Sequence, residues 1–328
     1  MKAYIGKLTD DWVMSCSRLP AISGLSSWST PNDELKKSIR ALGYTVTGEA
    51  ESTVGEAAEM GNLYEGPILY AGAQRLGLSI DMEITERVEA SDLSLQGSLD
   101  GILQGDGRTI TTDPDRGIYV YSAESVTLDG PGIAEAKLTS DFPADAPRMT
   151  RGPLQCQGLQ ICTGFKWHAI FTLFRGVELR IFVGATDEAM QAKIYDDVRD
   201  FQRRIDLFKR DQVTDWYPAL TPNDAANTYD RSEDDLPPIK LSGASNDAAL
   251  DLIRAKAQRA MIDKRIEELQ AQVMDQMGLH TKAIVYTGDE PTAELTWGMT
   301  GATKEYTVKA RPPARAKSLR IKELRRSD

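Results

Sequence analysis

Residues 132–140 read GIAEAKLTS, and this short stretch decides how the sequence is interpreted. It follows a turn-forming Gly130-Pro131 pair and begins with apolar residues, which predicts a β-strand. Side chains at positions i and i+2 of a strand share one face, so the Glu135 carboxylate and the Lys137 ammonium are expected to point into the same space. A carboxylate is a hard oxygen ligand of the kind that Mg²⁺ prefers, and a neighbouring lysine can orient a water molecule. Phosphodiester hydrolysis uses this combination.

The same spacing occurs a second time, in Glu34-Leu35-Lys36 within NDELKKSIRALG (32–43). That segment is predicted to be a helix that stops at Gly43, and on a helix positions i and i+2 lie about 200° apart. The two side chains therefore cannot converge on one ion. Glu34 is expected to be a solvated acid in the first helical turn, where the helix dipole favours negative charge.

A second acid, Asp100, lies at the end of an apparent strand in SLDG (98–101). By itself, an Asp before Gly101 is typical of a turn. Mg²⁺ sites, however, commonly take one or two carboxylates together with backbone and water oxygens. Asp100, Glu135 and the backbone carbonyl of Ala136 would form such a set, so the combination favours a metal ligand.

Helical patterns are predicted on both sides of these strands. Apolar spacing in GEAAEMGNLYEGPILYAGAQRLGL (55–78) predicts a helix that carries Glu65 and has a boundary close to Pro67. Two further helices are predicted at about 153–163 and from 187 to about 211.

The strands between 80 and 137 are expected to include a hairpin at Asp106-Gly107, because this dipeptide favours tight turns. Two more strands, WHAIFTLF (167–174) and VELRIFVGA (177–185), are joined at Arg175-Gly176. His168 lies in the first of them and is interpreted as a packed or surface residue rather than a catalytic one. Helices that flank a mixed sheet make a layered α/β domain.

The chain is expected to contain a main domain (1–215), a linker (216–245) rich in Pro, Asn, Asp and Ser, and a C-terminal extension (246–328). The extension begins with a single long helix that ends at Gly278, and it continues with a small β-hairpin formed from AIVYTG, LTWGMT and EYTVKA. An apolar stripe along the helix is interpreted as packing against its own domain rather than pairing with a partner helix. The stripe consists of Ile262, Ile266, Leu269, Val273 and Met277.

Composition narrows the functional classes. A net charge of −10 argues against a general nucleic-acid coat, but residues 304–326 hold nine basic residues and only two acids. That basic tail is either a solubilising end or a DNA contact. Three scattered cysteines and two histidines support neither a disulfide framework, a zinc site nor an iron–sulfur cluster. No apolar run is long enough for a signal peptide or a membrane span, so a cytoplasmic protein is expected.

Three segments together resemble the YqaJ-like viral recombinase family, to which bacteriophage lambda exonuclease also belongs. They are GSLDGIL (97–103), GIAEAKLTS (132–140) and PLQCQGLQICTGFKW (153–167). The resemblance also takes in SRLPAISGLSSWSTP (17–31) and GNLYEGPIL (61–69), and it spans about residues 10–210. These proteins are PD-(D/E)-x-K nucleases, so the resemblance implies a restriction-endonuclease-like α/β fold. The linker and the C-terminal extension resemble an extension that some phage members carry.

The resemblance implies a role for each residue that matches by position. Asp100 and Glu135 would bind the metal together with the Ala136 carbonyl, and Lys137 would be the catalytic lysine. Glu65 would be the helix-borne acid that completes the centre.

Gln155 matches a glutamine that some of these nucleases place beside the nucleophilic water. A surface position is an equal alternative for Gln155, and Gln157 or Gln160 could face the site instead.

Ser17, Arg18 and Ser98 fall where lambda-type exonucleases hold the 5′-phosphate of the digested strand. An upstream arginine of that phosphate pocket has no counterpart, because Asp10 stands near its position. Either Arg18 or another basic residue substitutes for it, or the protein engages 5′ ends differently.

The implied activity is that of a Mg²⁺-dependent deoxyribonuclease, with Mn²⁺ as a substitute ion. It would digest linear duplex DNA, most simply 5′ to 3′, to leave 3′ overhangs for recombination by single-strand annealing. The resemblance further implies a single-strand annealing protein as partner and a homotrimer as assembly. The alternatives are an endonuclease of the same fold and a non-catalytic DNA-binding or assembly protein.

Overall fold

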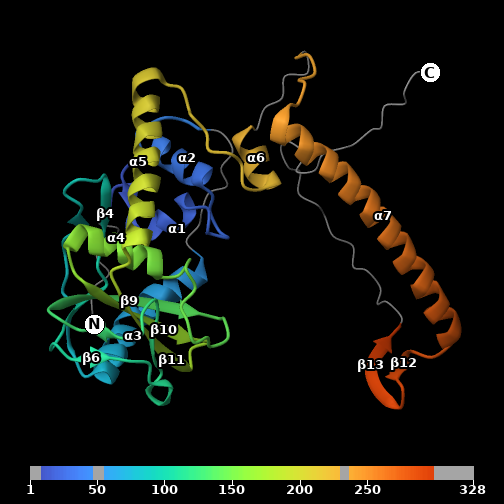
Figure 1. Cartoon of the computed structure of the whole chain (residues 1–328), viewed down its shortest axis with the longest axis horizontal. Helices are drawn as coiled ribbons and strands as arrows, with labels where there is room; N and C mark the ends of the chain where they lie inside the picture. The colour runs from blue at the N-terminus through green and yellow to red at the C-terminus, as the bar shows by residue number, and fades with distance from the viewer. Residues whose placement is uncertain (1–8, 47–54, 230–235, 299–328) are drawn as a thin grey trace. The chain divides into compact units, whose positions relative to one another are not determined.

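The computed structural model describes residues 9–46, 55–229 and 236–298 (Figure 1). The chain divides into two compact units, residues 1–230 and residues 231–328. Nearly all of the buried apolar core belongs to the first unit.

A six-stranded mixed sheet forms the centre of the first unit, with strand order β2-β5-β9-β10-β11-β7. Strands β9 and β10 are parallel, β11 and β7 are parallel, and the other neighbours are antiparallel, which confirms the expected mixed sheet. The strands are β2 (Ser79–Asp81), β5 (Gly101–Gln104), β7 (Ile118–Val120), β9 (Pro131–Thr139), β10 (Trp167–Phe174) and β11 (Glu178–Ala185).

Helices, 3₁₀ turns and smaller strands surround the sheet. The first unit contains the helices α1 (Leu19–Ile22), α2 (Pro31–Ala41), α3 (Glu56–Leu76), α4 (Pro153–Thr163), α5 (Glu188–Asp211) and α6 (Pro222–Thr228), and the 3₁₀ turns η1 (Cys16–Arg18) and η2 (Pro114–Arg116). Its smaller strands are β1 (Met14–Ser15), β3 (Val88–Glu89), β4 (Leu95–Gly97), β6 (Thr109–Ile110) and β8 (Val126–Thr127).

Helix α3 covers one face of the sheet. Its buried residues, including Leu69 and Ala73, join Trp167 and Phe171 of β10 in one apolar cluster. Gly72 allows the closest approach, because a Cβ atom at this position would lie 2.4 Å from the Phe171 ring. The face of β9 that carries Ala134 and Ala136 is therefore turned toward α3.

Helices α4 and α5 lie on the opposite side (Figure 1). The apolar residues of α5 recur every three or four positions, and Val198 and Phe201 pack with Ile133 and Ile170 of the sheet. The Asp187 side chain caps α5 by accepting a hydrogen bond from the Met190 N–H at 2.9 Å. The face of β9 that carries Glu135 and Lys137 therefore lies on the α4 side.

The turn between β10 and β11 confirms the expectation for Arg175-Gly176. The Val177 N–H donates to the Phe174 carbonyl at 3.0 Å, and the two residues between them have positive φ values, 52° and 74°, as a type I′ turn requires. The hairpin expected at Asp106-Gly107 is wrong, because β6 pairs with β8 instead of β5. After β5 the backbone continues alongside residues 128–130, where the Gly107 N–H donates to the Leu128 carbonyl at 2.8 Å.

Helix α3 also differs from the prediction, since it runs through Pro67 without ending there. A proline removes one helical hydrogen bond and costs about 3 kcal/mol in a helix interior. Pro67 is exposed, and the residues that follow it are buried against the sheet. Burial of Ile68, Leu69 and Ala73 offsets the cost of the missing bond.

The first unit extends to residue 230, beyond the expected boundary at 215, because part of the expected linker is folded. Helix α6 packs on α2, and its Asp224 is only 1% exposed. The Asp224 carboxylate accepts hydrogen bonds from Asn32 Nδ2 at 3.2 Å and Thr30 Oγ1 at 3.1 Å. Residues 216–229 thus belong to the first unit.

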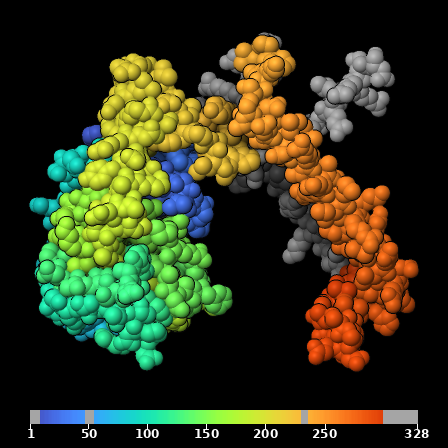
Figure 2. Space-filling model, viewed as in Figure 1, coloured from blue at the N-terminus to red at the C-terminus, as the bar shows by residue number. Residues whose placement is uncertain are grey.

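The second unit contains the long helix α7 (Gly243–Met277) and the hairpin β12 (Lys282–Thr287) and β13 (Glu290–Thr296). The apolar residues along α7 were expected to pack against their own domain, and this is wrong for all of them but one. Met277 is buried, whereas Ile262, Ile266, Leu269 and Val273 are exposed. The space-filling view shows this helix in orange and the hairpin in red (Figure 2). The hairpin follows the C-terminal end of α7, and the helix is about 50 Å long, so a short hairpin cannot cover it. The EYTVKA segment and the basic tail lie outside the described residues.

No helix in the described parts of the chain combines the length and the apolar character that a membrane span requires.

Candidate active site

Strand β9 presents Glu135 and Lys137 side by side on one face. The Lys137 Nζ donates a hydrogen bond to Glu135 Oε1 and a second one, at 3.1 Å, to Gln155 Oε1 in the first turn of α4. Glu135 is 1% exposed, and the Lys137 side chain is 24% exposed. The pair therefore has a buried acid at its base and a partly accessible ammonium above it.

Asp100 reaches the same strand from the start of β5. Its Oδ2 accepts a hydrogen bond from the Ala136 N–H at 3.0 Å. Strand β5 begins only at Gly101, so the Asp100 side chain bonds to β9 beyond the end of the strand ladder. The N–H and C=O of one strand residue point to the same side, so the Ala136 carbonyl is directed toward Asp100 as well.

Glu135 lies in an environment that opposes its charge. Burial raises the pKa of Glu135 to about 8; the charges of Asp100 and Glu65 add to the rise, and Lys137 opposes it. Burial disfavours the charged form of Lys137, but Glu135 and Asp100 outweigh this effect, so its pKa lies above the ordinary value. Three carboxylates and one ammonium thus influence each other at this point of the sheet.

Glu65 approaches from the other side of the sheet. It is partly exposed on α3, three residues before the buried pair Ile68 and Leu69 begins the tightly packed part of the helix. Its contribution to the Glu135 pKa places its charge within electrostatic reach of β9.

One buried oxygen has no partner within the described part of the chain. Glu135 Oε2 is inaccessible and accepts no hydrogen bond, although its other oxygen is bonded to Lys137. A buried acceptor without a partner costs about 1–3 kcal/mol, and more if it is charged. A cation beside this oxygen would remove that cost and favour the ionised form of Glu135.

The ligand set for a metal is small. Among residues 9–46, 55–229 and 236–298, no group of three or more His, Cys, Asp or Glu side chains is arranged to hold a metal ion. The residues that fit are two carboxylates, Asp100 and Glu135, with the Ala136 carbonyl between them. Mg²⁺ accepts such a set because it usually keeps several of its water ligands.

Gln155 is the glutamine of α4 that faces the site. Gln157 is buried and engaged elsewhere, since its amide donates to the Ala185 carbonyl at 2.8 Å. Gln160 donates to the Phe165 carbonyl at 3.1 Å and lies 3.2 Å from His168 Nδ1. Three-dimensional packing thus selects between alternatives that the sequence left open.

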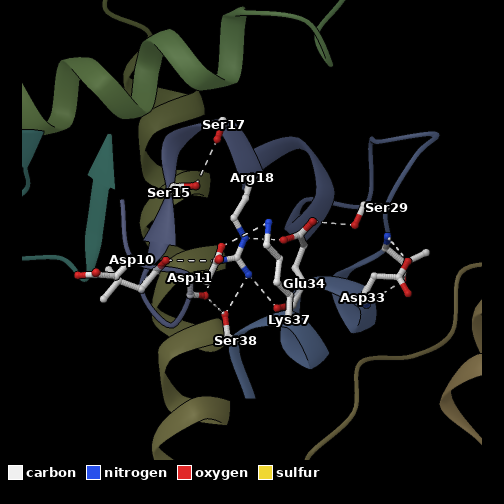
Figure 3. A network of polar contacts seen from close by, with 12 residues as sticks. Asp10, Asp11, Ser15, Ser17, Arg18, Ser29, Asp33, Glu34, Lys37 and Ser38 are labelled. Atoms are coloured by element: carbon white, nitrogen blue, oxygen red, sulfur yellow. Dashed lines mark hydrogen bonds and ion pairs between the residues drawn. The ribbon is translucent and has the colours of Figure 1, made fainter. Parts of the chain in front are cut away.

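Arg18 is not available to bind a phosphate. It is 6% exposed, forms an ion pair with Glu34, and donates to Ser38 Oγ at 2.9 Å and to the Asp11 carbonyl at 2.9 Å (Figure 3). These groups surround the guanidinium, so its expected role in a 5′-phosphate pocket is not supported. The expectation of a solvated Glu34 is wrong for the same reason, because Glu34 neutralises this buried cation.

The two serines of the expected phosphate pocket are placed differently. Ser17 is exposed, and its Oγ lies 3.2 Å from Ser15 Oγ (Figure 3). Ser98 is partly exposed and precedes Asp100 by two residues in the sequence.

His168 is packed, as expected. It is inaccessible, its Nε2 is hydrogen-bonded to the Tyr121 hydroxyl, and burial lowers its pKa to about 3. It is therefore a neutral core residue at ordinary pH.

No family model matches this sequence, and a comparison with curated proteins finds no match. Among the solved structures to which this chain is similar, three are described as exonucleases or their complexes. An alkaline exonuclease from Laribacter hongkongensis (LHK-Exo) shares 16% identity with a TM-score of 0.42, over 62% of this chain and 94% of that one. Its complex with dAMP gives 15% and 0.41, over 61% and 93%. A phage-related exonuclease from Haemophilus somnus 129PT gives 15% and 0.40, over 61% and 96%. The chain is similar in fold to these proteins at low sequence identity.

Proposed function

We propose that this protein is a Mg²⁺-dependent DNA nuclease with its active centre on β9. The observation that supports this most directly is Glu135 Oε2, a buried carboxylate oxygen without a hydrogen-bond partner in the described structure. Asp100 and Lys137 both contact this part of β9. An aspartate can help to hold a metal ion, and a lysine can orient the attacking water. A purely structural carboxylate would be expected to have both oxygens satisfied.

Each residue has a role that follows from its position. Asp100, Glu135 and the Ala136 carbonyl would hold the ion, for which Mn²⁺ is expected to substitute. The bound ion would polarise the scissile phosphate and lower the pKa of the attacking water.

Lys137 supplies the remaining polar group. Its ammonium has three N–H donors, and two of them are engaged by Glu135 and Gln155. The third is left for the attacking water or a phosphate oxygen. The bonds to Glu135 and Gln155 fix the position of Nζ before the substrate arrives, which lowers the reorganisation that the reaction requires. Glu65 adds a third negative charge that favours cation binding.

We further propose that the substrate is linear duplex DNA, digested 5′ to 3′ to leave 3′ overhangs for a single-strand annealing protein. Ser17 and Ser98 are the members of the expected 5′-phosphate trio that are accessible. A homotrimer that encircles the duplex belongs to the same proposal.

Endonuclease activity is the second candidate, and one observation favours it. Arg18 is buried in an ion pair with Glu34, so it is not free to hold a terminal 5′-phosphate as expected. A nuclease without that pocket has less reason to start at an end. The complete set of Asp100, Glu135 and Lys137 argues against a non-catalytic binding protein.

The test is digestion of end-labelled linear duplex, with and without a 5′-phosphate, and of closed circular DNA. Each reaction is run in Mg²⁺ and in EDTA with the wild type and with Lys137→Ala. We expect Mg²⁺-dependent loss of label from linear DNA and a loss of at least a hundredfold in the variant, in line with removal of a positioned catalytic group. Cutting of circles would select the endonuclease, and full activity of Lys137→Ala would refute the site.

A further inference from the structure

The segment that follows the catalytic strand folds back against it. Residues 140–152 connect β9 to α4. At its start, the Asp141 N–H donates to Thr139 Oγ1 at 3.2 Å, and near its end Arg151 Nη1 donates to the Leu138 carbonyl at 3.3 Å. The Leu138 carbonyl belongs to the residue directly after Lys137. Both ends of this connection are therefore held beside the candidate active site.

An aromatic ring projects from this connection. Phe142 is 76% exposed, and the Arg175 guanidinium lies 4.5 Å from the centre of its ring. The Arg175 N–H donates to the Thr139 carbonyl at 2.7 Å, which anchors this cation–π pair to the end of β9. Thr139 is two residues beyond Lys137, roughly 7 Å along an extended strand. Arg175 covers one face of the ring, and the exposed fraction leaves the other face open to a ligand.

The connection carries two acids, Asp141 and Asp145, and two arginines, Arg148 and Arg151, and Arg175 adds a third arginine from the β10–β11 turn. Arg148 lies on the same connection and pairs with Asp141 at 3.2 Å. Within the described residues, no carboxylate is within ion-pair distance of Arg151 or Arg175. A single exposed aromatic residue is common and needs no explanation. Here, however, the Phe142 ring is stacked on the guanidinium of Arg175, which has no acidic partner within the described residues. The guanidinium of Arg151 is bonded to β9.

Aromatic rings combined with arginines are the usual means of holding an unpaired nucleic-acid strand. A base inside a duplex has neighbours on both faces, so an open ring can stack only on a terminal or unpaired base. The arginines supply contacts for the phosphates on either side of that base.

We propose that Phe142 and Arg175 form a stacking subsite for an unpaired base of the DNA strand held at Glu135 and Lys137, and that Arg151 contacts a phosphate of that strand. This inference rests on the proposed nuclease function and adds to it: the enzyme holds its DNA with at least one base unstacked from the duplex. The ligand class is single-stranded DNA or a frayed end.

The test measures binding of a single-stranded oligonucleotide that contains 2-aminopurine, in EDTA, so that the result does not depend on catalysis. Full-length wild type, Phe142→Ala and Phe142→Tyr are compared by the change in 2-aminopurine fluorescence. Loss of one stacked base corresponds to roughly 5- to 150-fold weaker binding. We expect Phe142→Ala to lose on the order of tenfold in affinity and Phe142→Tyr to retain it.

Val177→Ala is the matched control, because Val177 is 85% exposed and follows Gly176 in the turn that contains Arg175. It should bind as the wild type does. A closed circular duplex, which has neither a terminal nor an unpaired base, is the second ligand, and Phe142→Ala should lose little affinity for it.

Two results would overturn the subsite: equal binding of the single strand by Phe142→Ala and the wild type, or equal weakening for the single strand and the closed duplex. The nuclease proposal fails separately. If the wild type digests no DNA in Mg²⁺ while Phe142→Ala still binds the single strand more weakly than Phe142→Tyr does, the subsite stands and the hydrolytic function does not.

Discussion

At the scale of a single residue, the carboxylate of Glu135 is buried, and its Oε2 atom has no hydrogen-bond partner within the described structure. We expect Glu135→Gln to raise the free energy of unfolding in EDTA at pH 9, above the Glu135 pKa of about 8, by about 1 kcal/mol, because the amide removes the repulsion of the ionised carboxylate from Asp100 and Glu65. Nuclease activity should fall at least a hundredfold. Chemical denaturation and digestion of labelled duplex measure the two effects.

Glu34→Gln is the matched control, since Glu34 belongs to the second Glu-x-Lys sequence of this chain. It should have the opposite effect on stability, a loss of about 3 kcal/mol, because Arg18 would keep a buried charge without a partner. A stability loss of similar size in both variants would show that Glu135 is a structural residue.

His168 makes stability depend on pH. Its folded-state pKa is lowered to about 3 by burial, whereas an unfolded histidine titrates near 6.5. The unfolded chain therefore binds a proton that the folded chain refuses, and stability falls as the pH drops below 6.5. Between pH 6.5 and pH 5 the His168 contribution is a loss of about 2 kcal/mol, while Glu135, with its raised pKa, contributes in the opposite direction. The effect of His168 is therefore read as the difference between the wild type and a variant without this residue.

Urea denaturation at both pH values, with His168→Gln and His280→Gln as variants, measures this dependence. The His280 side chain is exposed, so its variant should follow the wild type, while His168→Gln should lose about 2 kcal/mol less than the wild type between pH 6.5 and pH 5. Identical slopes for wild type and His168→Gln would contradict the prediction.

Sequence patterns located the residues of the site but did not determine what each one contacts. The period of a strand was enough to place Glu135 and Lys137 on one face. The choice among Gln155, Gln157 and Gln160 depended on which side of α4 faces β9, and no local pattern contains that information. Arg18 was assigned to a phosphate by the family resemblance. Its actual partner, Glu34, was not predicted because it lies 16 residues away and only folding brings the two side chains together.

The contact between α3 and β10 determines, at the scale of elements, where Glu65 lies. Gly72→Ala would place a Cβ atom 2.4 Å from the Phe171 ring, so the helix must shift away from the sheet. We expect a loss of about 1–3 kcal/mol in stability. Nuclease activity should also fall, because Glu65 lies two helical turns before Gly72 on the same helix face.

Gly61→Ala is the matched control on the same helix. A Cβ atom at Gly61 meets nothing within 4 Å, so this variant should gain up to about 1 kcal/mol from helix propensity and keep its activity. Thermal unfolding and duplex digestion of both variants are the measurements. A destabilised Gly72→Ala with full activity would remove Glu65 from the active centre.

Elements defined by local signals were predictable, and elements defined by distant pairing were not. Helices α4 and α5 and the β10–β11 turn follow from capping residues, apolar spacing and a two-residue turn. The Asp106-Gly107 dipeptide, a tight-turn signal between two strand-like runs, predicted a hairpin. The actual partner of β6 is β8, and register between distant strands depends on the rest of the sheet.

The position of the domain boundary illustrates the limit of composition as a guide, at the scale of the whole molecule. Residues 216–229 have the polar composition of a linker, yet Asp224 is buried and accepts hydrogen bonds from α2. A polar side chain that is satisfied by hydrogen bonds inside a fold has the same sequence signature as one in solvent. Similarly, the stripe on α7 predicted burial, but a stripe specifies only an apolar face and not what covers it.

The division of the chain yields the last prediction. Every residue of the proposed centre, from Glu65 to Gln155, lies in the first unit, and the two apolar clusters of the structure contain no residue beyond 217. A chain that ends at Asp230 should therefore unfold cooperatively at the temperature at which the first unit of the full chain unfolds. It should also hydrolyse a short labelled duplex at a rate within about threefold of the full chain, because no group that touches the reacting phosphate is removed.

A chain that ends at 215 is the control, since it loses Asp224 and leaves Asn32 and Thr30 without their buried partner. It should be less stable by several kcal/mol. If the chain ending at Asp230 folds but cuts no DNA, the second unit supplies a group that the reaction requires.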